Sequence, residues 1–237
     1  MSGVIVNTIT VIIGSITGLL FKKGMPKKIT DAIMIGIGLC TVSIGISGLV
    51  SDVNTIILII SIVLGAIVGT ALDIDAKINH MGDFLSKKFK SNDDKASVSE
   101  GFVTACLLFC IGSMTIVGSL NAGISGDNKL LYTKALLDLV SSTVLATSLG
   151  IGVLFASAFV FVFQGALVML SQQIAPFLTP ETITQLNGAG SLLILALGLN
   201  IVGITKIKIA NYLPAIVFAP ILTYIYSFVM TYISTLM

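Results

Sequence analysis

The segment that decides the fold is KALLDLVSSTVLATS, residues 134–148. The chain on both sides of it is strongly apolar, but this segment carries a lysine, an aspartate and five hydroxyl side chains. Ionisable side chains are costly in the hydrocarbon core of a membrane. Whether this segment crosses a membrane therefore determines how many spans the chain has and where these polar side chains lie.

The composition of the chain is typical of an integral membrane protein. Of its 237 residues, 55% are hydrophobic and only 10% are charged, and the mean hydropathy is +1.06. Soluble domains carry about 25% charged residues, so this chain has too little polar surface for a soluble globule. We expect a single, all-α transmembrane domain over residues 1–237, surrounded by the lipid bilayer. The net charge of +2 is too small to indicate a nucleic acid as partner.

The number of spans depends on one segment. A membrane-spanning helix needs about 20 mostly apolar residues. The clear candidates, all rich in aliphatic residues, are 3–21, 30–50, 55–72, 101–120, 150–171, 183–204 and 211–235. The segment 130–148 is the uncertain one, and it decides between seven and eight spans.

The positions of the lysines favour eight spans. Cytoplasmic loops are enriched in basic residues, and the loops at 22–28 and 73–99 carry most of the lysines. The short turn TKIK at 205–208 lies on the same side only if 130–148 and 150–171 both cross the membrane. We therefore predict a bundle of about eight transmembrane helices.

This arrangement also predicts the orientation. With eight spans, eleven of the thirteen lysines are cytoplasmic, and the two exceptions are Lys129 and Lys134. The N-terminus and the C-terminus are then both external. The alternative is seven spans plus a re-entrant hairpin at 130–171 that returns to its own side.

Glycine-rich motifs indicate an internal repeat of a helical hairpin. IGSITG at 13–18 resembles LGAIVG at 64–69, and the helices that follow these motifs also share a similar pattern. Small residues four apart are a general device for close helix packing, so a chance likeness between glycine-rich helices is the alternative. The candidate repeat units are residues 1–50 and 51–123.

The long loop at 73–99 predicts an amphipathic helix on the cytoplasmic surface of the membrane. Apolar residues recur at helical spacing among its lysines, a pattern typical of helices that lie in the membrane interface. These residues are Ile78, Met81, Leu85 and Phe89.

The polar segment places charged groups deep in the membrane. If it enters from outside, Lys134 lies about 6 Å and Asp138 about 12 Å below its start, and Ser141 and Ser142 reach about the midplane. An aspartate at this depth must pair, become protonated or contact a water-filled cavity. One interpretation is a structural ion pair between Lys134 and Asp138. The other is that the stripe lines an ion or solute path, with Asp138 as the site of a coupling H+ or Na+.

Other polar residues in or near the spans are candidates for the same path. Each is also typical of a hydrogen bond between helices. They are Asn7, Thr41, Asn121, Gln164, Asn187 and Asn200. Breaks in helices expose backbone groups that bind ions, and we predict such breaks at 186–190, at Gly150 and Gly152, and at Pro214 and Pro220.

The sequence argues against an enzyme. GISG, at 45–48 and 123–126, matches the G-x-S-G motif of intramembrane serine proteases, but that chemistry needs a base beside the serine. The single histidine, His80, belongs to the loop on the opposite side. No H-E-x-x-H motif and no nucleotide-binding G-x-x-x-x-G-K-[ST] loop is present. We therefore expect no catalytic residue, no metal site and no cofactor.

Part of the chain resembles a known family. GAGSLLILALGLNIVGITKIKIANYLPAIV at 188–217, KALLD at 134–138 and FQGAL at 163–167 resemble a bacterial membrane family, domain of unknown function 554. The most specific part is the first stretch, with its glycines, Asn200 and the Asn211-x-x-Pro214 pattern. The resemblance extends over nearly the whole chain and implies a polytopic protein of the bacterial plasma membrane. It implies no substrate and no catalytic residue.

Three functions are consistent with these observations. The first is a secondary transporter of a small solute or ion, coupled to H+ or Na+. The second is a passive channel, a homo-oligomer whose subunits pack through glycine-rich faces. The third is a membrane scaffold or accessory subunit that transports nothing and has a dry interior.

Overall fold

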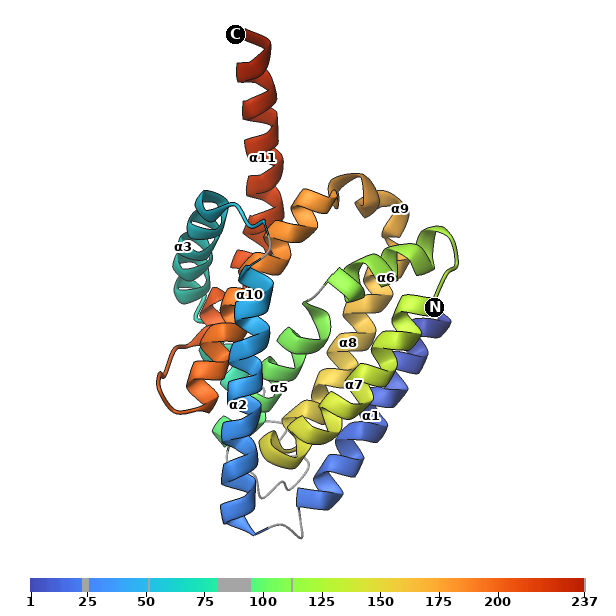
Figure 1. Ribbon diagram of the computed structural model, residues 1–237, viewed down its shortest axis with the longest axis vertical. Helices are drawn as coiled ribbons and strands as arrows, with labels where there is room; N and C mark the ends of the chain where they lie inside the picture. The colour runs from blue at the N-terminus through green and yellow to red at the C-terminus, as the bar shows by residue number, and fades with distance from the viewer. Residues whose placement is uncertain (23–25, 51, 81–94, 112, 237) are drawn as a thin grey trace.

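The computed structural model describes residues 1–22, 26–50, 52–80, 95–111 and 113–236 (Figure 1). This part of the chain is helical and contains no strand, as the sequence predicted. Its main helices are α1 (Ser2–Lys22), α2 (Lys27–Leu49), α3 (Thr55–Ala71), α5 (Lys95–Cys110), α6 (Ser113–Ile124), α7 (Lys129–Leu149), α8 (Gly152–Met169), α10 (Pro180–Ile201) and α11 (Ala215–Leu236). A helical segment, Ile74–His80, follows α3. Short helical turns are α9 (Ser171–Ile174), η1 (Ala175–Phe177) and η2 (Ile209–Tyr212).

Helices α1 and α7 pack side by side and run parallel (Figure 1). A Cβ atom added to Gly3 would touch Leu131, and one added to Gly18 would touch Ala146. The residue numbers differ by 128 in both pairs, and a constant difference is the mark of parallel helices. Because α7 contains the deciding segment, that segment runs in the same direction as the first helix, as the eight-span arrangement requires.

Helices α2 and α10 form a second close pair, which is antiparallel. Gly38 lies against Val202, and Gly48 lies against Ser191, so the numbers fall on one helix as they rise on the other. Helix α3 packs in the same way on η2 and α11. Small residues let the backbones of these helices approach closely, as is common in membrane bundles.

The outer surface of the bundle is apolar. Along α1, Ile9, Ile13, Ile16 and Leu20 are exposed, whereas the buried face of the helix consists mainly of small residues and Asn7. In a soluble protein the aliphatic face of a helix turns inward. The reverse arrangement is typical of a helix whose aliphatic face contacts lipid.

Six segments are each long and apolar enough to cross a membrane: α1, α2, α7, α8, α10 and η2 with α11. Two pairs of helices meet the same criteria together but are bent: α3 with Ile74–His80 by 55°, and Val98–Cys110 with Met114–Ile124 by 57°. The described chain therefore has six candidate spans, or up to eight if each bent pair is one span. This agrees with the predicted polytopic helix bundle.

The structure corrects three predictions about helix continuity. The break predicted at Pro220 is wrong, because α11 continues through this residue. The expected single helix at 101–120 is instead α5 and α6, which meet at an angle around residue 112. Conversely, α10 is continuous through the glycines at 186–190, so the break predicted there is wrong. Those glycines serve packing, because a Cβ at Gly190 would strike the side chain of Ile111. The predicted break at Gly150 is confirmed, with φ of +75° between α7 and α8.

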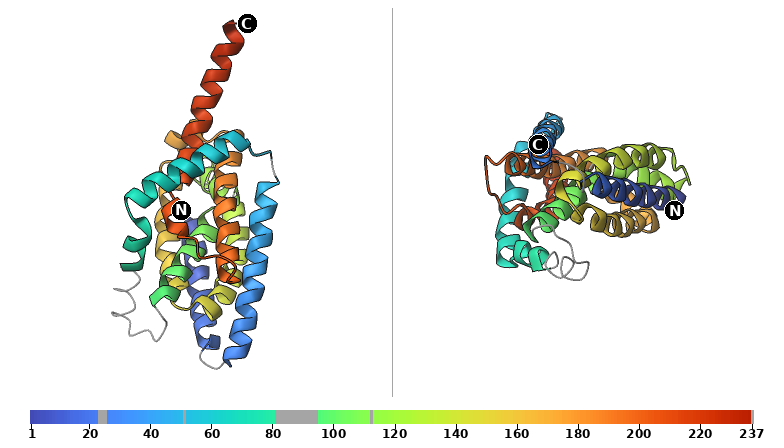
Figure 2. Two further views of the ribbon diagram at one scale, coloured as in Figure 1. Left: turned by 90° about the vertical axis from the view of Figure 1, so that its left-hand side faces the viewer. Right: turned by 90° about the horizontal axis from the view of Figure 1, so that it is seen from below.

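Basic residues mark one end of the bundle, which we call the lysine end. The end of α1 at Lys22, the start of α2 and the α7–α8 junction lie there (Figure 1). At the opposite end the N-terminus adjoins the α6–α7 connection, where the Gly3 N–H donates a hydrogen bond of 3.0 Å to Asn128 Oδ1. Helix α11 projects from the bundle away from the lysine end (Figure 2).

Two predictions about organisation stay predictions. The structure does not test the repeat units 1–50 and 51–123. Most of the predicted amphipathic helix at 73–99 lies outside the described residues, although its first part, Ile74–His80, is helical.

Candidate functional site

Lys134 and Asp138 form an ion pair inside the bundle. Their side chains lie on successive turns of α7, with 2.5 Å between Lys134 Nζ and Asp138 Oδ2. Each side chain is only 7% exposed. The Lys134 ammonium also lies 5.8 Å from the centre of the Phe109 ring, within the range of a cation–π contact. The pairing that the sequence offered as one interpretation is confirmed, which leaves the question of what surrounds the pair.

Polar residues from α1, α7 and α8 lie at one level of the bundle. On each of these helices a polar residue stands between two buried apolar residues. The sets are Val4, Asn7 and Val11; Leu131, Asp138 and Leu145; and Val168, Gln164 and Val160. The first member of each set belongs to one hydrophobic cluster and the last member to another. The polar residues therefore form a layer between two hydrophobic clusters.

A fourth helix, α6, carries a buried hydroxyl group close to the first of these clusters, and we group it with the polar residues. Ser119 of α6 is fully buried and lies one turn from Ala122, a member of the first cluster. We call Asn7, Ser119, Lys134, Asp138 and Gln164 the polar layer. It contains one cation, one anion, two carboxamides and one hydroxyl.

The neutral groups of the polar layer lack partners within the described part of the chain. Asn7 and Gln164 are both 0% exposed, and neither amide atom of either residue makes a hydrogen bond. The Ser119 hydroxyl is also unpaired. The Asn7 amide lies beside the Asp138 carboxylate and stabilises its charge, although the two groups do not reach regular hydrogen-bond geometry. A buried polar group without a partner costs about 1–3 kcal/mol, and such groups are rare enough to require an explanation.

The bend between α5 and α6 adjoins the ion pair. Phe109 and Cys110 end α5, and both Lys134 and Asp138 act electrostatically on the Cys110 thiol. Across the bend, the Thr115 hydroxyl donates a hydrogen bond of 3.0 Å to the Phe109 carbonyl. Interrupted helices beside a polar site are a recurrent feature of membrane transporters, because the ends of the half-helices present backbone groups to ligands.

The hydroxyl stripe predicted on α7 is partly wrong. Ser142 is fully buried at the α1–α7 contact, where its hydroxyl donates to the Leu139 carbonyl at 3.1 Å. Ser141 is exposed on the outside of the bundle. The helical turn of 100° per residue, counted from Asp138, carries Ser142 toward α1 and leaves Ser141 at the edge of the buried face.

The remaining candidates lie apart from the polar layer. Thr41 of α2 is buried, and its hydroxyl donates to the Ile37 carbonyl at 2.8 Å. Asn121 of α6 and Asn187 of α10 are half-buried, and Asn187 Oδ1 has no partner. Neither belongs to the three aligned sets described above. The structure therefore brings Asn7 and Gln164 to the ion pair but does not bring these three residues to it.

Asn200 fixes the loop at residues 205–208 through hydrogen bonds, beside a pocket that is separate from the polar layer. Its Oδ1 accepts hydrogen bonds from the Thr205 hydroxyl at 2.7 Å and from the Ile207 N–H at 2.9 Å, and its Nδ2 donates to the Ile207 carbonyl at 2.7 Å. These bonds use both ends of the amide. Asn200 is thus a structural clamp on the loop that carries Lys206 and Lys208.

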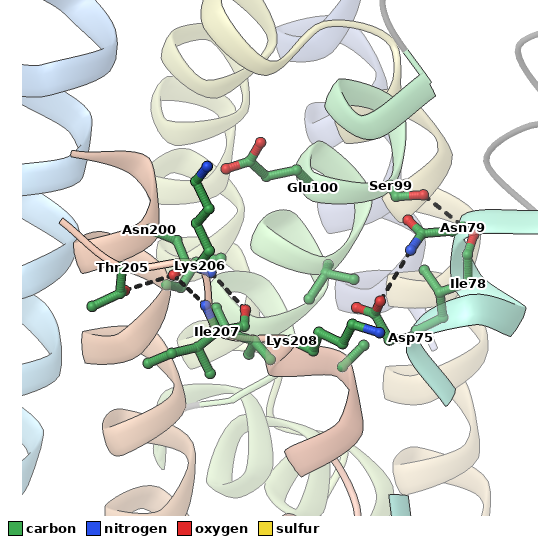
Figure 3. A pocket seen from close by; sticks show the side chains of 14 residues that line it. Asp75, Ile78, Asn79, Ser99, Glu100, Asn200, Thr205, Lys206, Ile207 and Lys208 are labelled. Carbon is green, nitrogen blue, oxygen red and sulfur yellow. Dashed lines mark hydrogen bonds between the residues drawn. The ribbon is translucent and has the colours of Figure 1, made fainter. Parts of the chain in front are cut away.

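The hollow beside this loop, which we call the vestibule, has a volume of about 460 Å³. Charged side chains of both signs line it, and Figure 3 shows the Lys206 ammonium pointing toward the Glu100 carboxylate. The Lys208 ammonium likewise points toward Asp75, whose backbone N–H is held by Asn211 Oδ1 at 2.8 Å. The vestibule is therefore a polar recess with balanced charge.

Helix α5 runs from the vestibule to the polar layer. Glu100 lines the vestibule, and Phe109 and Cys110 adjoin the ion pair. Between them Thr104 is fully buried, with a hydroxyl that has no partner. Among the described residues, one unpaired polar group, the Thr104 hydroxyl, thus lies on α5 between the two sites.

The sequence reasoning missed several of these residues. Phe109, Cys110 and Ser119 were not among the candidates, because nothing local distinguishes them from other residues of an apolar helix. Within the described residues, no group of three or more His, Cys, Asp or Glu side chains is placed to hold a metal ion.

These features define the class of the protein: a polytopic helical membrane protein with a buried ion pair beside a bent helix. The chain belongs to the family described as protein of unknown function (DUF554), which matches residues 2–224. This confirms the resemblance seen in the sequence.

Two relatives match almost end to end. The chain is 34% identical to the uncharacterized membrane protein YdfK of Bacillus subtilis (strain 168) over 229 residues, which cover 95% of this chain and 96% of the relative. It is 30% identical to the uncharacterized protein YqgA of Escherichia coli (strain K12) over 220 residues, or 92% of this chain and 94% of the relative. No solved structure matches the chain.

Proposed function

We propose that this chain is a secondary transporter of a small solute or ion, coupled to H+ or Na+. The observation that carries the proposal is the polar layer: a buried ion pair with two unpaired carboxamides, placed beside a helix interruption. A structural ion pair alone needs no such neighbours. Groups that stay unpaired in one conformation have a role if they bind a solute in another.

Asp138 is the coupling site in this proposal. A carboxylate that is buried and balanced by one ammonium group can exchange that partner for a proton or a sodium ion. The exchange leaves the buried Lys134 charge without its partner, which is costly, and so biases the bundle toward a conformation in which Lys134 reaches water or another anionic group. No catalytic step and no resident cofactor is part of the mechanism.

The vestibule serves as the cytoplasmic entrance, and the membrane is the bacterial plasma membrane. Lysine-rich ends of membrane proteins face the cytoplasm, which places the vestibule inside and both termini outside. The parallel run of α1 and α7 supports this orientation, since both then cross from outside to inside. The unpaired hydroxyl of Thr104 lies on the route along α5 toward Asp138.

The experiment that tests the proposal measures whether the polar layer opens to water from both sides. Ser119→Cys is introduced into a chain whose three native cysteines are replaced by alanine. A charged thiol reagent that does not cross membranes is applied to right-side-out and to inside-out vesicles. The matched control is Ser61→Cys, because Ser61 is equally buried but its hydroxyl is paired with the Ile57 carbonyl at 2.6 Å.

A transporter predicts labelling of the Ser119→Cys chain from each side and none of the Ser61→Cys chain. If the two cysteines are equally unreactive, the interior is dry, as a scaffold requires, and the proposal is wrong. Labelling from both sides together with steady ion conductance in a planar bilayer identifies a passive channel, which also contradicts the proposal.

A further inference from the structure

The unpaired hydrogen-bonding groups and the charges of the polar layer indicate the chemistry of a ligand that could bind there. Gln164 leaves an amide NH2 group, which donates hydrogen bonds, and a carbonyl oxygen, which accepts them, without a partner among the described residues. Asn7 also makes no hydrogen bond of regular geometry, although its amide lies beside the Asp138 carboxylate. Lys134 and Asp138 add one positive and one negative charge. The layer therefore offers both donors and acceptors of hydrogen bonds, and charges of both signs.

Ligands of a single charge leave part of this layer unsatisfied. A metal cation fits the carbonyl oxygens and Asp138 but leaves both NH2 groups unpaired and opposes the Lys134 ammonium. An anion fits the NH2 groups and Lys134 but leaves the oxygens and Asp138. A neutral polar solute pairs with the amides but does not compensate either charge if the ion pair opens, and an uncompensated buried charge is strongly destabilising.

We propose that the polar layer binds a small zwitterion of the amino-acid type, an inference that rests on the proposed transport function. The ammonium group of the ligand pairs with Asp138, and its carboxylate pairs with Lys134. The ion pair between Lys134 and Asp138 is replaced by two ion pairs with the ligand, so every buried charge has a partner. The carboxamides of Asn7 and Gln164 then bind both ends of the ligand.

The same carboxylate explains how binding and coupling are linked. Asp138 holds the ammonium group of the ligand only when no other cation occupies it. The coupling cation and the ligand therefore occupy Asp138 in turn, and this alternation couples their movements.

The packing is loose at a residue next to the layer, which is consistent with a small ligand. Gly165, next to Gln164, is buried, yet a Cβ atom added to it would meet only Met1 Cε, at 3.9 Å. Most other buried glycines lie against backbone or side-chain atoms at less than 3 Å. This loose packing is close to the N-terminal end of α1, on the side that the proposed orientation places outside.

The test is ligand-dependent thermal unfolding of the purified full-length chain in detergent. The probes are glycine, L-alanine and L-serine, compared with propionate and ethylamine, which carry only the negative or only the positive group. A ligand at one hundred times its Kd raises Tm by about 5–10 °C for a chain of this size. The zwitterions are expected to do so, and the singly charged analogues are not.

Two variants separate binding from folding. Gln164→Met and Asn7→Leu replace unpaired buried amides by apolar groups of similar size, which should keep or raise Tm without ligand. Both should lose the rise in Tm that zwitterions cause. The control Ser61→Ala, which lies outside the layer, should keep it.

Three outcomes overturn the inference: no zwitterion raises Tm, the singly charged analogues raise it as much, or the variants respond like the original chain. Transport is measured separately in proteoliposomes. If zwitterions bind but do not cross, the transport function fails while the binding site stands. If a singly charged solute is transported and zwitterions neither bind nor cross, the transport function stands and this inference fails.

Discussion

Removing Lys134 and Asp138, singly and together, tests how strongly the ion pair is coupled. At 2.5 Å, two unit charges attract each other by about 6–7 kcal/mol at an effective dielectric constant of about 20. Lys134→Met leaves the Asp138 charge buried without a partner, and Asp138→Leu leaves the Lys134 charge. Each single change should cost about 3–5 kcal/mol of stability, whereas the double change, which leaves no charge, should cost about 0–1 kcal/mol.

The assay is thermal unfolding of the four proteins in detergent, each with Cys40 and Cys106 replaced by alanine. It is followed by a dye that reacts with the buried thiol of Cys110 as it becomes exposed. At about 2–4 °C per kcal/mol, each single change lowers Tm by about 6–20 °C, and the double change restores it. The control is Lys208→Met, which removes an exposed lysine and should cost less than about 1 kcal/mol. If the double change costs as much as the two single changes added together, the two charges are not coupled and the reasoning is refuted.

Three further predictions concern the framework of the site. Gly18→Ala should lower stability by about 1–3 kcal/mol because the new Cβ would strike the Thr143 carbonyl of α7, whereas Gly36→Ala, with open space around it, should not; equal stabilities in a thermal melt would contradict the parallel α1–α7 contact. Asn200→Ala removes three hydrogen bonds and should speed tryptic cleavage at Lys206, and an unchanged rate would mean that Asn200 is not the clamp. In membranes, cleavage at Lys206 should occur in inside-out vesicles and be absent in right-side-out vesicles, and the opposite result would reverse the orientation.

Lysine placement and helical spacing were enough to predict much of this site. The positive-inside rule predicted that 130–148 crosses the membrane, and this segment is α7, a helix parallel to α1. The i,i+4 spacing of Lys134 and Asp138 predicted their ion pair. The i,i+4 spacing is local and the lysine distribution depends only on charge. Both can therefore be read from the sequence without knowing how the helices pack.

What the sequence did not predict depends on contacts between distant segments. The bend at the α5–α6 junction, and with it the position of Phe109 beside Lys134, has no stronger local signal than the glycines at 186–190, where α10 stays straight. Ser141 and Ser142 are adjacent and chemically identical, and only the packing of α1 against α7 decides which one is buried. Asn7 and Gln164 were candidates together with four other residues, and only the alignment of the three helices distinguishes them.

The central claim, that Asp138 couples ion movement to solute movement, is tested most directly by solute-driven ion flux. Proteoliposomes with the original chain or with Asp138→Asn are exposed to zwitterionic, anionic, cationic and neutral solutes, and the entry or exit of protons and of sodium is recorded with each. The account predicts that at least one solute drives ion flux through the original chain and that Asp138→Asn abolishes the flux while the protein still inserts in the membrane. Undiminished solute-driven flux through Asp138→Asn, or the absence of any solute-driven flux through the original chain, would contradict it.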